Sequence, residues 1–249
     1  MEKRKLNKKK LAVVFIIILV GTILLVKVLK KKDTVKTSSE NKLEETNFNI
    51  DEEPKEKMKK EITDWRLKLA NTENILPKDF KPELANIDKT RQFDARAIKY
   101  LNNMINDMKK SGISNVWVQS AYRSIERQKE LYDRKINIYL SEGKTQAEAE
   151  KLTDEYIARP GASDHNLGLA VDFNNVDNNF EDLKAFKWLK ENAENYGFIL
   201  RFPKDKEDIT KIEYESWHWR FVGEEHAKKM NELNMCLEEY VEYLQNEPN

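Results

Sequence analysis

Two histidine-containing stretches, far apart in the sequence, constrain most strongly how this chain can fold. The first, SDHNLGLAVD, occupies residues 163–172, and the second, ESWHWR, occupies residues 215–220. The chain has three histidines, and two of them lie in these stretches. Two imidazoles, a carboxylate and a further free carboxylate suit a catalytic zinc site, which keeps three protein ligands and one open position. We therefore expect a fold that brings the two stretches together.

The first stretch can place a histidine and an aspartate at one site. His165 follows the turn-forming run 160–163, and Asp172 lies within the apolar run 169–173, which is typical of a short buried strand. Gly168 permits the chain to bend between them. A buried carboxylate needs a partner, and either a metal ion or an arginine would satisfy Asp172.

The second stretch needs a local bend before it can contribute two groups. His218 begins the strand-like run 217–222, and Glu215 precedes it by three residues. In an ideal strand these two side chains would face opposite ways, so a turn or bulge must bring them together. The spacing differs from the helical HExxH pattern. Taken singly, each histidine is more often a packed or surface residue than a metal ligand.

A third segment, residues 116–132, runs from a predicted strand into a predicted helix. The chain thus carries SAYRSIERQKELY at 120–132, PGASDHNLGLAVDF at 160–173 and YESWHWRFVG at 214–223. In this order and with these residues, the chain resembles the zinc-dependent VanY-type D-alanyl-D-alanine carboxypeptidases. The resemblance extends over about residues 64–246.

The resemblance implies a zinc peptidase that removes the C-terminal D-alanine from peptidoglycan stem peptides. The implied zinc ligands are His165, Asp172 and His218. Glu215 is the implied base, which takes a proton from the attacking water and passes it to the departing nitrogen. Glu213 is a rival base, but an exposed charge at a strand edge is the simpler interpretation of that residue.

The resemblance also implies three supporting positions. Arg123 would stabilise the negative oxygen of the tetrahedral intermediate, although a structural salt bridge explains this arginine equally well from the sequence alone. Ser163 and Gln128 would line the substrate site. One departure is visible, because Asp164 stands where the family commonly has glutamate. We expect this shorter side chain to change contacts around the first histidine without abolishing activity.

Two other functions remain open. The same family contains L,D-carboxypeptidases that act on tetrapeptide stems, and the sequence does not separate them from D,D-enzymes. A non-catalytic zinc-containing domain that binds peptidoglycan is the other alternative. The presence of both Glu215 and Arg123 argues against it.

Two further residues have simpler interpretations. His226 lies near the start of a predicted C-terminal helix, and we expect it to pack against the protein rather than bind metal. Cys236 is the only cysteine, so it cannot form an intrachain disulfide. We expect it to be a small core residue.

The N-terminal region predicts a membrane anchor. Residues 1–10 are basic, and residues 11–29 are apolar except for Lys27, which can extend its amine to the interface. No small-x-small cleavage site follows, which favours an uncleaved signal anchor. Six basic residues precede the apolar run and four lie at its other end, so we expect a cytoplasmic N-terminus and an extracytoplasmic catalytic domain on a single-pass membrane protein.

Charge divides the chain into unlike parts. Residues 1–32 hold ten basic residues and one glutamate, which leaves 34 basic and 43 acidic residues in the rest. An acidic domain is a poor partner for nucleic acid. Residues 30–62 are charged and contain few apolar residues, as expected for a flexible linker.

Residues 63–249 suit one domain, which we expect to be monomeric. The predicted fold is α+β, with a small, largely antiparallel sheet flanked by helices. Ser124 and the pair Thr145 and Glu148 predict helix N-caps. The expected strands are 116–120, 169–174, 198–202 and 217–222, and the expected helices are 93–108, 124–140, 145–158, 181–195 and 224–245.

Overall fold

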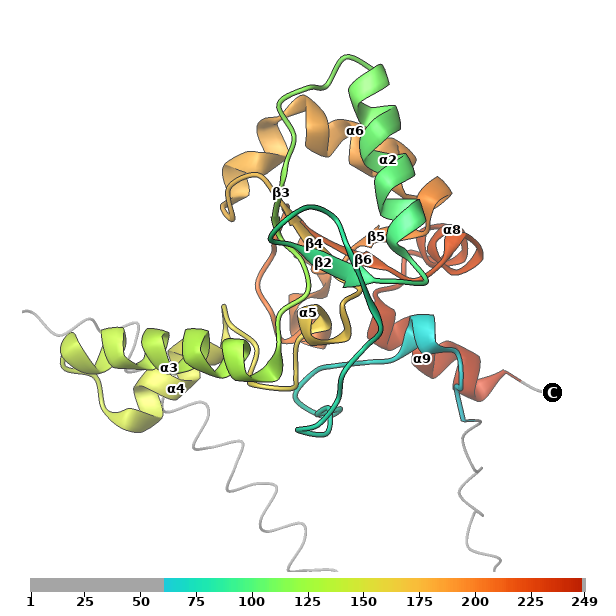
Figure 1. Ribbon diagram of the computed structural model, residues 1–249. Helices are drawn as coiled ribbons and strands as arrows, with labels where there is room; N and C mark the ends of the chain where they lie inside the picture. The colour runs from blue at the N-terminus through green and yellow to red at the C-terminus, as the bar shows by residue number, and fades with distance from the viewer. Residues whose placement is uncertain (1–60, 248–249) are drawn as a thin grey trace, which may run out of the picture. The chain divides into compact units, whose positions relative to one another are not determined.

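The computed structural model describes residues 61–247 (Figure 1). The predicted N-terminal segment 1–10 and the predicted anchor 11–29 lie outside these residues, as does the linker up to residue 60. Within residues 61–247, no helix combines the length and the apolar composition needed to cross a membrane.

The described residues form an α+β fold, as predicted. The strands are β1 (Leu84–Asn86), β2 (Gln92–Asp94), β3 (Val118–Ser120), β4 (Ala170–Phe173), β5 (Phe198–Leu200) and β6 (His218–Phe221). The α-helices are α2 (Ile98–Lys110), α3 (Ile125–Ser141), α4 (Gln146–Asp154), α5 (Asp164–Leu167), α6 (Lys184–Asn192), α7 (Glu207–Thr210), α8 (Glu224–Leu233) and α9 (Leu237–Asn246). The 3₁₀ turns are η1 (Trp65–Leu67), η2 (Asn178–Asp182), η3 (Ala193–Tyr196) and η4 (Lys204–Lys206).

The central sheet has four strands in the order β3-β4-β6-β5, and each neighbouring pair is antiparallel. The register of β4 and β6 sets Asp172 opposite His218 and Val171 opposite Trp219. Side chains alternate between the two faces of a strand, so this register separates a polar pair from an apolar pair. The sheet therefore has one face for the core and another for polar groups.

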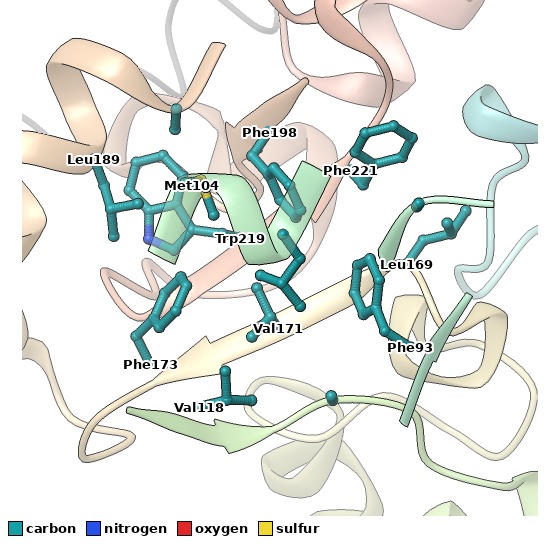
Figure 2. Packing of buried hydrophobic residues seen from close by; sticks show 14 of the residues in the cluster. Phe93, Met104, Val118, Leu169, Val171, Phe173, Leu189, Phe198, Trp219 and Phe221 are labelled. Atoms are coloured by element: carbon teal, nitrogen blue, oxygen red, sulfur yellow. The ribbon is translucent and has the colours of Figure 1, made fainter. Parts of the chain in front are cut away.

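The apolar face packs against α2 and α6, which lie above the sheet as drawn in Figure 1. Figure 2 shows Val171, Phe173 and Trp219 of the sheet together with Met104 of α2 and Leu189 of α6. All five side chains are buried. Truncating a buried aromatic such as Phe173 to alanine typically costs about 3–5 kcal/mol of stability. This core fixes the plane of the sheet and, with it, the opposite face.

The predicted helix N-caps are present at α3 and α4. The Ser124 hydroxyl accepts a hydrogen bond from the backbone N–H of Arg127 at 3.1 Å. Thr145 and Glu148 form the reciprocal capping box at the start of α4. The two helices bury Ile136 and Ala149 in a small cluster of their own, so α3 and α4 stabilise each other apart from the main core.

Three predicted helices differ from the observed elements. The helix predicted at 93–108 begins only at Ile98, because Gln92–Asp94 pairs with β1 in a two-stranded ribbon. The helix predicted at 224–245 is divided into α8 and α9, because Asn234 adopts a left-handed conformation that ends α8. The helix predicted at 181–195 is divided among η2, α6 and η3.

Candidate metal centre and active site

The polar face of the sheet brings His165, Asp172 and His218 together. Asp172 and His218 are opposite each other in β4 and β6, and α5 places His165 over this pair. The Nε2 atom of His165 lies 3.2 Å from Asp172 Oδ2, and His218 Nδ1 lies 3.3 Å from Asp172 Oδ1. All three residues are buried, and their ligand atoms lie within 4.8 Å of one another. The arrangement could hold one metal ion.

The short helix α5 depends on two local features. The Ser163 hydroxyl accepts a hydrogen bond from the backbone N–H of His165 at 3.3 Å and so caps the helix. Gly168 then reverses the chain with a φ of 72°, which is in the left-handed region. A side chain there would also press on Leu84 and on the backbone N of Asp94. The bend that the sequence predicts at Gly168 is therefore present.

The hydrogen bond of His165 leaves one of its ring nitrogens for a metal. His165 Nδ1 lies 2.7 Å from the carbonyl oxygen of Ala121, so this nitrogen carries the proton and donates it. Its Nε2 then presents a lone pair to the centre. Asp172 Oδ1 is buried and has no hydrogen-bond partner among residues 61–247. A metal ion would satisfy that oxygen, so the residues fit a two-histidine, one-carboxylate zinc site.

Burial and neighbouring charges shift the pKa values of the three side chains in opposite directions. Burial lowers the pKa of His165. Burial would also lower the pKa of His218, but the neighbouring carboxylates of Asp172 and Glu215 outweigh burial and raise that pKa to about 9. For Asp172, burial favours the neutral acid, yet His165 and His218 hold its pKa below the usual range. Positive charge at this centre therefore stabilises the carboxylates of Asp172 and Glu215, and a divalent cation would supply it.

Glu215 reaches the centre through the predicted turn. The backbone N–H of His218 donates to the Glu215 carbonyl oxygen at 3.3 Å, which closes a turn just before β6. Glu215 Oε2 consequently lies 3.2 Å from His218 Nδ1. Burial raises the pKa of the Glu215 carboxyl, as suits a group that must both accept and return a proton. Glu213, the rival base, is exposed.

Arg123 lies beside this centre with its guanidinium held in place. Its Nη1 donates to Gln128 Oε1 at 2.8 Å, and its Nη2 donates to Ser120 Oγ at 3.0 Å. Its backbone N–H donates to the carbonyl oxygen of His165 at 3.0 Å. No salt bridge to Arg123 occurs among residues 61–247. Burial lowers the pKa of Arg123, whereas the charges of Asp172 and Glu215 oppose that shift.

The two residues predicted to line the substrate site have clear structural contacts. Gln128 is buried, and its Nε2 donates to the carbonyl oxygen of Ala158 at 2.6 Å while its Oε1 accepts from Arg123. The amide therefore orients the arginine. Ser163 is buried at the N-cap of α5. Contact of either residue with substrate stays a prediction.

Sequence reasoning missed two sets of polar residues around this centre. Asn166 joins the loops, because its Nδ2 donates to the Arg123 carbonyl oxygen and its Oδ1 accepts from Gly161 N–H. Arg201 and Arg220 both bind Asp164, the residue beside His165. A signal for Arg220 was present, since it lies two residues after His218 and so faces the same side of its strand.

The remaining histidine and the cysteine lie away from the centre. His226 belongs to α8 and packs against α9, with its Nδ1 3.0 Å from the hydroxyl of Tyr240 and its Nε2 3.2 Å from Asp64 Oδ2. Cys236 is buried and free. Both positions agree with the interpretations drawn from the sequence.

Comparison with known proteins places this arrangement in a family. The family model for VanY, D-alanyl-D-alanine carboxypeptidase, matches residues 90–224, more than half of the chain. The chain belongs to the VanY family. A D-alanyl-D-alanine carboxypeptidase of Enterococcus faecalis is 37% identical to it over 178 residues, which are 72% of this chain and 66% of that relative. The match thus spans slightly less than two thirds of that relative's length.

Solved VanY-family structures share the fold. The vancomycin-resistance D,D-pentapeptidase VanY in complex with Zn(II) is 37% identical, with a TM-score of 0.64 over 71% of this chain and 99% of that one. The LdcB LD-carboxypeptidase is 34% identical, with a TM-score of 0.62 over 70% of this chain and 84% of that one. Since the two are similar to this chain to nearly the same degree, overall likeness does not distinguish D,D from L,D specificity.

Proposed function

We propose that this protein is a zinc peptidase that removes the C-terminal D-alanine from peptidoglycan stem peptides. The observation that carries the proposal is the buried convergence of His165, Asp172 and His218 beside Glu215. This is a complete donor set with an adjacent base, in a member of the VanY family. The three ligand residues would hold the zinc ion, and Glu215 would act as base.

The chemistry follows from the positions of the chain's own groups. A bound zinc ion would polarise the scissile carbonyl and lower the pKa of a coordinated water to about 7. Glu215 would remove a proton from the attacking water and pass it to the nitrogen of the departing D-alanine as the C–N bond breaks. Arg123, fixed by Gln128 and Ser120, would donate to the oxygen that becomes negative when water adds to the carbonyl.

Removal of the terminal D-alanine from a D-Ala-D-Ala end is the activity we propose first. It is supported by the matched family model and by the named activity of the Enterococcus faecalis relative. Cleavage of tetrapeptide stems by an L,D-carboxypeptidase is the second candidate, because the LdcB LD-carboxypeptidase shares the fold at 34% identity. A catalytically silent zinc domain is disfavoured because both Glu215 and Arg123 lie at the centre.

We further propose that residues 11–29 anchor the protein in the cell membrane and that residues 30–62 tether an extracytoplasmic, monomeric domain. The apolar composition of the first segment and the basic residues 1–10 support this topology. The test is protease treatment of intact cells, followed by detection of tags at either end. Loss of a C-terminal tag with survival of an N-terminal tag is expected, whereas a protected C-terminal tag would overturn the orientation.

The proposed activity is tested by supplying defined stems to the purified full-length protein. Pentapeptide ending in D-Ala-D-Ala and tetrapeptide ending in D-Ala are incubated separately, and the products are identified by mass. We expect loss of one alanine from the pentapeptide and its suppression by a zinc chelator. Cleavage of the tetrapeptide alone would replace the D,D assignment with the L,D assignment, and cleavage of neither would contradict both.

A further inference from the structure

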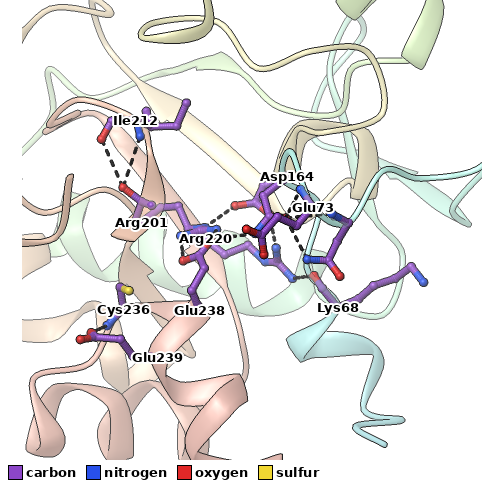
Figure 3. A network of polar contacts seen from close by, with 12 residues as sticks. Lys68, Glu73, Asp164, Arg201, Ile212, Arg220, Cys236, Glu238 and Glu239 are labelled. Atoms are coloured by element: carbon purple, nitrogen blue, oxygen red, sulfur yellow. Dashed lines mark hydrogen bonds and ion pairs between the residues drawn. The ribbon is translucent and has the colours of Figure 1, made fainter. Parts of the chain in front are cut away.

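Four charged side chains from separate segments meet at Asp164, the residue next to His165 in α5. Asp164 belongs to α5, Arg201 follows β5, Arg220 belongs to β6, and Glu238 belongs to α9 (Figure 3). Asp164 and both arginines are at most 3% exposed. Two positive and two negative charges make the group neutral, so it has no need of solvent or of an outside ion.

Asp164 is the middle of this group, and it is the direct neighbour of the proposed zinc ligand His165. Its Oδ2 accepts from Arg201 Nε at 2.7 Å, and its Oδ1 accepts from Arg220 Nη1. The carboxylate is therefore held on both oxygens by fixed cations.

The two arginines connect Asp164 to the other histidine. The backbone N–H of Arg201 donates to the carbonyl oxygen of His218 at 3.1 Å. Arg220 lies two residues after His218 in β6, so both side chains point to the same face of the sheet. Each arginine thus joins the segment of one proposed ligand to the segment of the other.

The far ends of the arginines are also fixed. Arg201 donates from Nη1 and Nη2 to the two oxygens of Glu238, at 2.8 and 2.6 Å. Arg220 Nη2 donates to the carbonyl oxygens of Arg66 and Lys68 at 2.8 and 3.0 Å. A bidentate arginine–carboxylate pair defines orientation as well as contact. The group is consequently a rigid link between α5, the sheet and α9.

Stability alone is a weak reason for such a group, because apolar residues of similar volume often stabilise a core equally well. Position is a stronger reason, since contacts behind metal ligands commonly change metal affinity about 10–100-fold when they are removed. We infer that Asp164, Arg201, Arg220 and Glu238 are positioning residues that hold α5 against β6, so that His165 and His218 keep the separation a zinc ion requires. The inference rests on the ligand set given in the proposed function.

The test compares two buried aspartates that are each bound by arginine. Asp94 is fully buried and accepts from Arg96 Nη2 at 2.6 Å, but among residues 61–247 its carboxylate has no hydrogen bond to a segment that carries a proposed ligand. Zinc dissociation constants are measured for full-length protein by chelator competition. Asp164→Asn is expected to weaken zinc binding at least about 10-fold, whereas Asp94→Asn lowers the melting temperature without that change. Asp164→Glu, which restores the charge, is expected to restore most of the zinc affinity.

A second pair of variants gives a result even if Asp164→Asn does not fold. Glu238 and its neighbour Glu239 both lie in α9, but Glu239 bonds to Lys206 and to the backbone of Cys236 instead of to the buried group. Glu238→Gln is expected to weaken zinc binding several-fold more than Glu239→Gln. Equal effects within a pair that folds would overturn the inference. Wild-type protein that binds no zinc would instead contradict the ligand set itself.

Discussion

Two clusters in this domain contain the same types of metal-binding residue, yet only one has the character of a metal site. The central cluster is His165, Asp172 and His218, and the peripheral cluster is Asp64, Glu225 and His226. In both, the ligand atoms lie within 4.8 Å of one another. The central cluster is buried, whereas the Glu225 side chain of the peripheral cluster is 69% exposed.

The decisive difference is whether an arginine already pairs with the carboxylates of the cluster. Arg66 Nη2 lies 2.6 Å from Asp64 Oδ2, 2.7 Å from Glu225 Oε1 and 3.3 Å from His226 Nε2. A guanidinium therefore meets the charge demand of the peripheral cluster. In the central cluster the nearby arginine, Arg123, bonds to neutral groups instead, and Asp172 Oδ1 has no hydrogen-bond partner among residues 61–247. Ligand atoms that lie close together therefore do not make a metal site unless their negative charge lacks a cation within the protein.

The largest expected difference between the clusters concerns their adjoining glutamates. Glu215→Gln keeps the shape of the side chain but removes the base, so turnover of a stem peptide should fall about 10²–10⁴-fold while zinc content stays near wild type. Glu225→Gln, the matched change beside His226, should leave turnover unchanged. Steady-state kinetics with metal analysis checks both. Near wild-type turnover by Glu215→Gln would mean that another group is the base.

The arginines of the two clusters should differ next. Arg123→Ala should reduce turnover about 10²–10³-fold through loss of a donor to the developing oxyanion. Arg66→Ala should leave turnover and zinc content unchanged and lower the melting temperature, because it removes the arginine that pairs with Asp64. If Arg66→Ala instead acquired a second tightly bound zinc, the guanidinium alone would be what excludes metal there.

The smallest effect is a pH dependence of stability in the peripheral cluster. Burial would raise the pKa of Asp64, but the hydrogen bonds from Arg66 outweigh burial and hold it below the usual range. A depressed pKa contributes stability that is present above the unfolded-state value of about 3.9 and is lost as the pH falls below it.

Asp64→Asn should therefore lower the free energy of unfolding by about 1 kcal/mol at pH 7, and the difference should shrink below about pH 3.9. Urea titrations at several pH values check this, with Asp79→Asn as an exposed aspartate control. A difference that is constant across pH would show that the Asp64 charge contributes nothing.

Local patterns in the sequence predicted much of the site. The apolar run around Asp172 and the strand-like run at His218 predicted their strands. Glu215 and His218 would face opposite ways in an ideal strand, which predicted the turn that the structure shows. Gly168 predicted the bend of α5. Each of these depends on residues a few positions apart, where stereochemistry alone decides the result.

Features that depend on distant residues were not predictable in the same way. Strand β2 contains residues whose apolar spacing suits the start of a helix, but their pairing with β1 overrides that local preference. The contact of Arg201 with Glu238 joins segments 37 residues apart, and no local pattern indicates it.

Metal content tests the central claim most directly. Zinc is measured by elemental analysis in purified wild-type protein, His218→Ala and His226→Ala, which change one histidine in each cluster. We predict about one zinc per chain in wild type and in His226→Ala, and its loss in His218→Ala, because only the central cluster has an unmet demand for positive charge. Full zinc content in His218→Ala, or its loss in His226→Ala, would contradict the account.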